Sequence, residues 1–188
     1  MRFLIITGPP FSGKGTQCAL IQQILNCEHI STGNLCRTEK ASDSNLGRQI
    51  AEYDTRGDLV PDEIINVLLA NYLDEHSEAN AAILDGYPRT QKQVDDLEEI
   101  LKHRNMKVDL VLNIEVPKEE LLNRAKERAK TSNRLDDKDP QIHIKRIELF
   151  QDETLPAINY MKSKFHVIDV DGTGSIAVTS EIIRSHIE

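Results

Sequence analysis

A glycine-rich segment near the N-terminus constrains the fold of this chain more than any other feature. Residues 8–17 read GPPFSGKGTQ, follow the apolar run 3–6 and precede the helix-like stretch 18–25. Glycines let a backbone curl around an anion with its N–H groups pointing inward, and the following helix adds a positive partial charge at its N-terminus. An ordinary turn between a strand and a helix would give no reason for the Lys-Gly-Thr of residues 14–16. The segment therefore predicts a phosphate-binding loop for a nucleoside triphosphate, with Lys14 over the outer phosphates.

Short apolar runs alternate with helical patterns along the rest of the chain. Runs typical of buried strands lie at residues 3–7, 29–30, 81–84, 110–114 and 167–170. Helical patterns cover residues 14–25, 33–38, 45–53, 61–75, 90–103, 118–130, 140–162 and 175–186. This alternation predicts an α/β fold in which helices cover both faces of a parallel sheet. Residues 31–60 and 129–139 do not follow this alternation of strands and helices, and we expect them to form mobile lobes over the phosphate-binding site.

Length and composition narrow the class of protein. The 188 residues contain no Pro/Gly/Ser-rich linker, so we expect a single domain. We see no long apolar span and no basic, apolar leader, which favours a cytoplasmic location. The formal charge of −8 argues against a broad basic surface for nucleic acid or for an anionic membrane, so a phosphate ligand needs a local cationic pocket. Cys18, Cys27 and Cys36 are odd in number and lack zinc-site spacing, which favours reduced thiols of structural or incidental role.

Further motifs lie downstream of the loop. They are HISTGNLCR at 29–37, GDLVPD at 57–62, DGYPRTQKQ at 85–93, RAKER at 124–128, TSNRLDD at 131–137, Arg146, TLPAI at 154–158 and DG at 171–172. In this order and over nearly the whole chain, they resemble the adenylate kinases. The resemblance implies the nucleoside-monophosphate kinase fold, a five-stranded parallel sheet in one P-loop domain over residues 1–188, with a monophosphate-binding lobe at 31–60 and a short lid at 128–139. It also implies transfer of the terminal phosphoryl group of MgATP to AMP, which gives two ADP.

The resemblance assigns roles to individual residues. It implies ATP-binding residues at Phe11, Ser12, Gly13, Lys14, Gly15, Thr16, Arg124, Arg128 and Gly174. It implies AMP-binding residues at Thr32, Arg37, Asp58, Leu59, Val60, Gly86, Tyr87, Pro88, Arg89, Gln93, Arg134 and Arg146. The catalytic residues that it implies are Lys14, Arg89, Arg128, Arg134 and Arg146. Cations suit this reaction, because transfer between two polyanions requires positioning and charge neutralisation rather than a nucleophilic side chain.

The metal expectations follow from the same resemblance. Asp85, at the end of a predicted strand, is implied to hold Mg²⁺ through bound water, which suits an ion that sheds its hydration shell reluctantly. Asp136 and Asp137 are implied to hold the lid arginines. The lid is short and contains no cysteine or histidine, so we expect no structural zinc. We interpret the six scattered histidines as surface or core residues, and we expect a monomer whose partners are ATP, AMP and ADP.

Two residues indicate which monophosphate accepts the phosphoryl group. Relatives that phosphorylate UMP or CMP carry a small residue in place of Thr32 and asparagine in place of Gln93. A glutamine amide both donates and accepts hydrogen bonds, so it can pair with the N6 and N1 edge of adenine. We therefore expect AMP as the acceptor, with a UMP/CMP kinase and a catalytically weak nucleotide sensor as the alternatives.

Three positions depart from the family pattern. Phe11 and Asn133 stand where glycine is usual, and Asn34 stands where aspartate is usual. Asparagine tolerates the left-handed backbone better than most residues, so Asn133 is a mild change. Asn34 removes a carboxylate that could order hydrated magnesium, but Asp85 remains. We expect the backbone of Phe11 to keep a negative φ while its ring covers the loop from outside.

Overall fold

Five parallel strands form the single sheet of the protein, whose computed structural model describes residues 1–56, 58–131 and 138–188. The strands are β1 (Arg2–Thr7), β2 (Glu28–Ser31), β3 (Ala81–Asp85), β4 (Val108–Glu115) and β5 (Val167–Asp171). Their order across the sheet is β2-β3-β1-β4-β5, so β1 is central, and Ile5 of β1 is in register with Leu84 of β3 and Val111 of β4. The predicted α/β fold with a five-stranded parallel sheet is confirmed.

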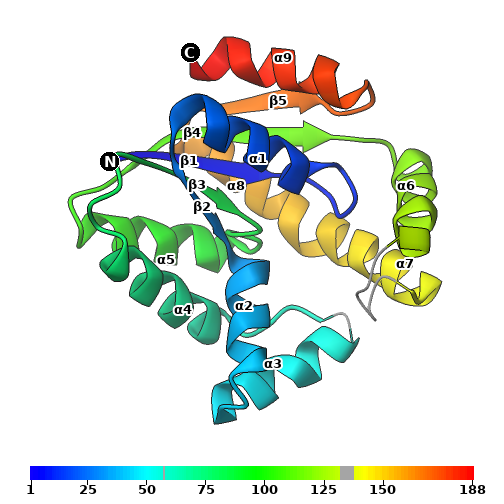
Figure 1. The fold of residues 1–188 in the computed structure, drawn as a ribbon, viewed down its shortest axis with the longest axis horizontal. Coiled ribbons are helices and arrows are strands. Elements are labelled where there is room, and N and C mark those ends of the chain that lie inside the picture. Colours follow the sequence, from blue (N-terminus) through cyan, green and yellow to red (C-terminus); the bar gives the residue numbers. More distant parts are fainter. Residues whose placement is uncertain (57, 132–137) are drawn as a thin grey trace.

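Helices cover both faces of this sheet (Figure 1). They are α1 (Lys14–Leu25), α2 (Thr32–Ala41), α3 (Asn45–Arg56), α4 (Asp62–Glu75), α5 (Gln91–Lys102), α6 (Lys118–Thr131), α7 (Pro140–Leu149), α8 (Leu155–Lys164) and α9 (Ile176–Ile187). Helices α1 and α9 lie on one face, and α4, α5 and α8 lie on the other. Within the described ranges, no helix combines the length and the apolar character needed to cross a membrane.

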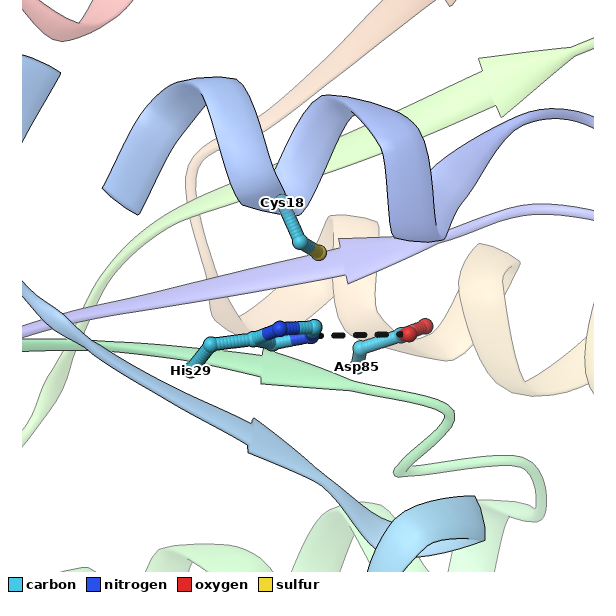
Figure 2. A group of neighbouring side chains, drawn as sticks. All are labelled: Cys18, His29 and Asp85. Atoms are coloured by element: carbon cyan, nitrogen blue, oxygen red, sulfur yellow. Dashed lines mark ion pairs between the residues drawn. The ribbon is translucent and has the colours of Figure 1, made fainter. Parts of the chain in front are cut away.

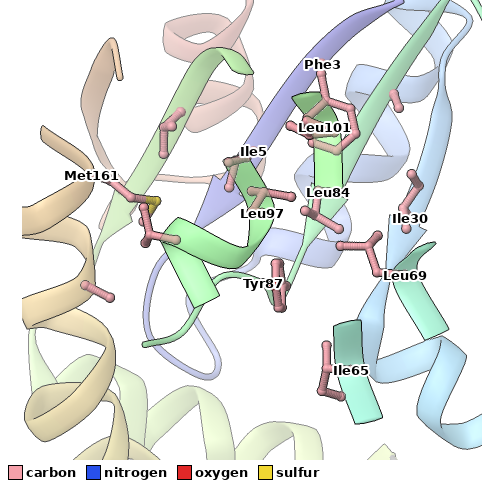
Figure 3. Close-up of a cluster of buried hydrophobic side chains, with 14 of the residues drawn as sticks. Phe3, Ile5, Ile30, Ile65, Leu69, Leu84, Tyr87, Leu97, Leu101 and Met161 are labelled. Atoms are coloured by element: carbon pink, nitrogen blue, oxygen red, sulfur yellow. The ribbon is translucent and has the colours of Figure 1, made fainter. Parts of the chain in front are cut away.

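The sequence of the central strand, β1, is apolar over residues 3–6 because both faces of the sheet are buried there. Successive side chains of a strand point to opposite faces of the sheet, and here both faces are covered. Phe3 and Ile5 therefore enter the core beneath α4, α5 and α8, whereas Leu4 and Ile6 enter the core beneath α1 and α9. All four side chains are completely buried. Figure 3 shows the first of these cores, where side chains of α5 and α8 meet the strands.

The helix predicted at 140–162 is interrupted. It consists of α7, a single π turn over Phe150–Thr154 and then α8. Pro156 has no N–H group to bond a carbonyl of the preceding turn, and its ring crowds that turn. A wider turn relieves this conflict, and the N–H of Leu155 accordingly donates to the carbonyl of Phe150, five residues earlier. The prediction that this segment is helical is confirmed, but the prediction of one continuous helix over 140–162 is wrong.

The lobe that we expected at 31–60 extends from the edge of the sheet where the strands end (Figure 1). Its helices α2 and α3 are each longer than the predicted 33–38 and 45–53. Helix α2 begins directly after β2, because the hydroxyl of Ser31 caps it by accepting a hydrogen bond from the N–H of Asn34. The start of α2 therefore lies at the carboxyl edge of the sheet, next to the end of β3.

Candidate active site

A cavity of about 490 Å³ opens at this carboxyl edge, the place where open α/β sheets bind ligands. Its walls come from the phosphate loop, the 31–60 lobe, the segment that follows β3, and helices α6 and α7. The predicted residues that line it are Phe11, Gly13, Lys14, Gly15, Thr16, Thr32, Arg37, Asp58, Leu59, Val60, Asp85, Gly86, Tyr87, Pro88, Arg89, Gln93, Arg128 and Arg146. The structure thus brings residues from four distant parts of the sequence into one space.

The phosphate loop connects β1 to α1 in the way its glycines predict. Gly8 has φ 140°, and a Cβ atom there would lie 2.5 Å from the carbonyl oxygen of Ile114. Gly13 has φ 93° at the start of α1. The ammonium group of Lys14 folds back over the loop and donates to the carbonyls of Gly8 and Pro9, 2.8 Å away in each case. The loop therefore forms a concave backbone surface with one lysine at its mouth, as an anion site requires.

The charge state of Lys14 depends on its surroundings. Burial lowers the pKa of its ammonium group to about 8, although the nearby Asp85 carboxylate acts in the opposite direction. A bound triphosphate would favour the charged form and raise this pKa again. Binding of such an anion at this loop would therefore be coupled to proton uptake by Lys14 near and above pH 8.

This coupling gives a measurable expectation. Above pH 8 a substantial part of the Lys14 side chains is neutral before a nucleotide binds, so ATP binding should take up protons there, and the ATP affinity should fall as pH rises further. Calorimetric titrations in two buffers of different ionisation enthalpy measure this uptake. Lys14→Arg, whose guanidinium stays protonated, serves as the control without uptake. Identical heats in both buffers for the unmodified protein would contradict the expectation.

Asp85 lies at the end of β3, and 15% of its side chain is exposed. Burial acts to raise the pKa of this carboxyl group, but the imidazole of His29 and the charge of Lys14 outweigh it and hold the pKa below its usual value. The His29 Nε2 atom lies 3.7 Å from the Asp85 carboxylate. An ionised carboxylate on the cavity wall fits a hydrated Mg²⁺ ion, which is commonly bound through only one or two carboxylates.

The opposite wall of the cavity carries Thr32 and Gln93, of which 3% and 2% are exposed. The backbone N–H of Arg89 donates to Gln93 Oε1 at 2.7 Å, and Gln93 Nε2 donates to the Asp62 carboxylate at 2.6 Å. Because a backbone N–H can only donate, it fixes which end of the amide is oxygen. Each end keeps one further hydrogen-bonding position, so Gln93 can still donate to and accept from a purine edge. Thr32 donates to the Asp85 carbonyl at 3.3 Å beside it.

Two arginines, Arg37 and Arg89, also line this cavity. Arg89 Nε donates to the carbonyl of Gly86 at 2.6 Å, and Gly86, at φ 82°, leaves no space for a side chain between Thr32 and Arg89. Arg37 of α2 donates to the side chain of Asn34. The residue that replaces the usual aspartate therefore contacts an arginine of the cavity.

A second cavity of about 360 Å³ lies on the other side of the phosphate loop. Its lining includes Ser12, Gly13, Arg124, Gly174 and Ile176. Arg124 Nη2 donates to the Gly172 carbonyl at 2.8 Å, and Arg124 Nε donates to Glu120 at 2.8 Å, so two hydrogen bonds hold its guanidinium group in place. The loop thus separates two cavities, and Phe11, Gly13 and Thr16 line both of them.

Phe11 corrects one prediction. Its φ is 67°, so the backbone is in the left-handed region and not at the negative φ that we expected. The ring packs edge to face against His143 of α7, with ring centroids 5.0 Å apart, and the Arg128 guanidinium lies 5.8 Å from its centroid. The left-handed backbone costs a bulky residue about 1–2 kcal/mol, and the aromatic and cation–π contacts offset part of this cost.

Two substitutions separate these effects. Phe11→Ala loses the ring contacts and keeps the backbone strain, whereas Phe11→Gly loses both. We therefore expect the glycine variant to have the larger free energy of unfolding, by about 0.5–1 kcal/mol, although glycine normally destabilises relative to alanine. Urea unfolding of both variants measures this difference. An alanine variant as stable as the glycine variant would show that position 11 is not strained.

Other residues fall outside the described ranges or were not anticipated. Gly57, Asn133, Arg134, Asp136 and Asp137 lie outside the described residues, so their predicted roles stay predictions. Sequence reasoning missed His29, which we interpreted as a surface or core residue, and Lys145 of α7. Lys145 Nζ lies 2.6 Å from the Asp58 carboxylate and 2.8 Å from the Arg56 carbonyl, so it lowers the pKa of Asp58 and connects the 31–60 lobe to α7. The only sequence feature that could have indicated a role for Lys145 is its position directly before Arg146, a predicted site residue.

Comparison with known proteins agrees with this geometry. The family profile described as adenylate kinase matches residues 6–166. An adenylate kinase of Thermosynechococcus vestitus is 39% identical over 98% of this chain and 96% of its own length. One from Leptospira biflexa is 38% identical over 98% of this chain and its entire length, and one from Xanthomonas campestris is 40% identical over 92% of each chain. With the phosphate loop, both cavities and this full-length similarity in agreement, the chain belongs to the adenylate kinase family.

Proposed function

We propose that this protein is an adenylate kinase, which transfers the terminal phosphoryl group of MgATP to AMP and releases two ADP. The observation that carries the proposal is that one cavity is lined both by Lys14, on the loop that would hold the donor, and by Arg89 and Gln93, on the wall that would hold the acceptor. Family membership supports the same reaction. The acceptor of this reaction is already an ionised phosphate, so no nucleophilic side chain is needed, and positioning with charge stabilisation lowers the barrier.

We assign the residues their roles in this reaction, and their places in the two cavities support the assignment. ATP would place its base in the second cavity along Arg124 and its phosphates in the concave loop under Lys14. AMP would place its base against Thr32 and Gln93 and its phosphate between Arg37 and Arg89. Arg128 and Arg146 lie where the transferred group would pass, and their charge would stabilise it in the transition state. Arg134 is proposed to join them by resemblance alone.

Magnesium is the proposed cofactor of this reaction. Asp85 would hold its bound water from the end of β3, and the ion would neutralise phosphate charge during transfer. We further propose that the chain acts in the cytoplasm, since its three cysteines carry thiols rather than disulfides, and that it acts as a monomer.

One experiment tests the function against its nearest rival. Turnover with MgATP and each of AMP, UMP, CMP and GMP should give the highest kcat/KM with AMP. A kcat/KM for UMP or CMP equal to that for AMP would identify a UMP/CMP kinase instead.

The acceptor wall gives a sharper test of the same point. In the double variant Thr32→Ala with Gln93→Asn, the amide retracts from the acceptor base and the wall loses a hydroxyl group. We expect the ratio of kcat/KM for AMP to that for UMP to fall by at least about tenfold, or about 1.4 kcal/mol of discrimination. Thr179→Ala, which changes a buried threonine on the donor side, should leave the ratio unchanged. An unchanged ratio in the double variant would mean that another part of the cavity selects the base.

A weakly active nucleotide sensor is the alternative that Phe11 raises. If the ring only covers the loop, Phe11→Gly should change kcat by less than about tenfold, a window of about 1.4 kcal/mol. A much larger gain in kcat would show that Phe11 restrains the enzyme, and would favour the sensor.

A further inference from the structure

Three side chains that can bind a metal ion meet behind the phosphate loop. Cys18 comes from α1, His29 from β2 and Asp85 from the end of β3, and Figure 2 shows Cys18 reaching toward the pair formed by the other two. One ligand atom of each, the Cys18 thiol sulfur, a His29 ring nitrogen and an Asp85 carboxylate oxygen, lies within 4.8 Å of both others. Sequence patterns could not reveal this group, because its members are far apart in the chain.

The spacing is close to that of a tetrahedral metal site. Bonds of 2.0–2.3 Å from zinc to nitrogen, oxygen or sulfur place neighbouring ligand atoms roughly 3.3–3.7 Å apart. The Nε2 atom of His29 and the Oδ2 atom of Asp85 are already 3.7 Å apart, and the largest separation in the group is at most 4.8 Å. Side-chain shifts of about an ångström would therefore complete the geometry.

The group also contains a buried ring nitrogen without a hydrogen bond to any described residue, because its contact with the Asp85 carboxylate, at 3.7 Å, is an ion pair beyond hydrogen-bond distance. His29 Nε2 is buried and has no hydrogen-bond partner among the described residues. A buried ring nitrogen in this state carries a desolvation cost that a bound cation would remove. Asp85 supplies an ionised carboxylate beside it, and the completely buried Cys18 supplies a soft sulfur ligand.

Access and a fourth ligand come from the first cavity. His29 and Asp85 both line it, so an ion can enter from this side and keep one water molecule. A cysteine binds a metal ion as the thiolate, so Cys18 must give up its thiol proton when the ion binds. Binding exchanges that proton for the metal: the S–H bond breaks, a sulfur–metal bond forms, the proton leaves to solvent, and no atom is oxidised or reduced.

We propose that Cys18, His29 and Asp85 form a binding site for one thiophilic divalent cation of the zinc and cadmium class. Magnesium does not fit this ligand set, because it requires oxygen ligands. A second part of the proposal rests on the role proposed above for Asp85: the carboxylate cannot hold hydrated magnesium and the thiophilic ion together. The site is therefore inhibitory, and it is separate from any zinc site in a lid.

Binding is tested on the full chain without nucleotide or magnesium. Titration with Cd²⁺ should show one tight equivalent and the ultraviolet charge-transfer band of a cadmium–thiolate bond. Cys18→Ala should remove the band and weaken binding by at least about 100-fold, since it deletes a direct ligand. Two variants are matched controls that keep both signals: Cys27→Ala, a buried cysteine in the same apolar core, and Cys36→Ala, a cysteine on the wall of the first cavity.

Three results would overturn the binding proposal. They are the lack of a one-equivalent site in the unmodified chain, equal affinity in Cys18→Ala, and an equal loss in Cys27→Ala or Cys36→Ala. None of these results depends on turnover, so they cannot be confused with a failure of the proposed function.

Inhibition is tested separately, with free Cd²⁺ held by a chelator buffer because ATP also binds the ion. Cys18→Ala should keep its turnover without cadmium and lose its sensitivity to it. Equal turnover of the unmodified enzyme with the site filled and empty would show that the site exists but does not inhibit.

Discussion

Replacing Lys14 with methionine should lower kcat/KM by about 10²–10³-fold, or about 3–4 kcal/mol of transition-state stabilisation. The ammonium group lies over the concave loop, where in the proposed reaction phosphate charge would increase during transfer, and methionine has similar length without the charge. Steady-state kinetics with varied MgATP at saturating AMP measure the effect. We expect ATP affinity to fall and AMP affinity to stay within about twofold.

Folding should not explain this loss. The pKa of Lys14 is lowered, so the fold holds the charged form less favourably than water does, and removing the charge should not reduce the free energy of unfolding. Lys162→Met, which removes a surface lysine paired with Asp169 on the far strand, is the matched control and should keep its turnover. Near-normal turnover in Lys14→Met would remove this residue from the site.

Arg89→Ala should cost about 10³-fold in kcat/KM, or about 4 kcal/mol, because it removes a delocalised cation from the acceptor side of the transferred group. Its effect on binding should be the opposite of that of Lys14→Met: AMP affinity falls and ATP affinity is retained. Equilibrium titrations of the variant with each nucleotide alone measure this division. Arg89→Lys should recover only part of the loss, since an ammonium cannot form two parallel hydrogen bonds to phosphate.

A surface arginine provides the control. Arg184→Ala removes an exposed arginine of α9 that pairs with Glu188, and it should leave both affinities unchanged. Loss of ATP affinity without loss of AMP affinity in Arg89→Ala would reverse the assignment of the two nucleotides to the two sides of the cavity.

Part of the candidate site could be predicted from the sequence, as Lys14, Arg89 and Gln93 illustrate. Lys14 follows the glycines of the loop, and Arg89 follows a strand that ends at the ligand edge, so local context identified both. Gln93 was identified by resemblance, but its hydrogen bond to Asp62 depends on how α4 packs against α5. Roles that depend on residues distant in the chain could not be read from local patterns.

The sequence by itself determined the five strands, the order of strands and helices along the chain, and the phosphate loop, because each depends on residues that are neighbours in the chain. A strand covered on both faces needs a continuous apolar run, and an anion-binding turn needs glycines next to a helix start. Only the tertiary structure decided the left-handed backbone of Phe11, the π turn before Pro156, and the meeting of Cys18, His29 and Asp85. The physical reason is that these features depend on packing: α6 and α7 supply the contacts that hold the ring of Phe11, and the sheet brings β2 and β3 beneath α1.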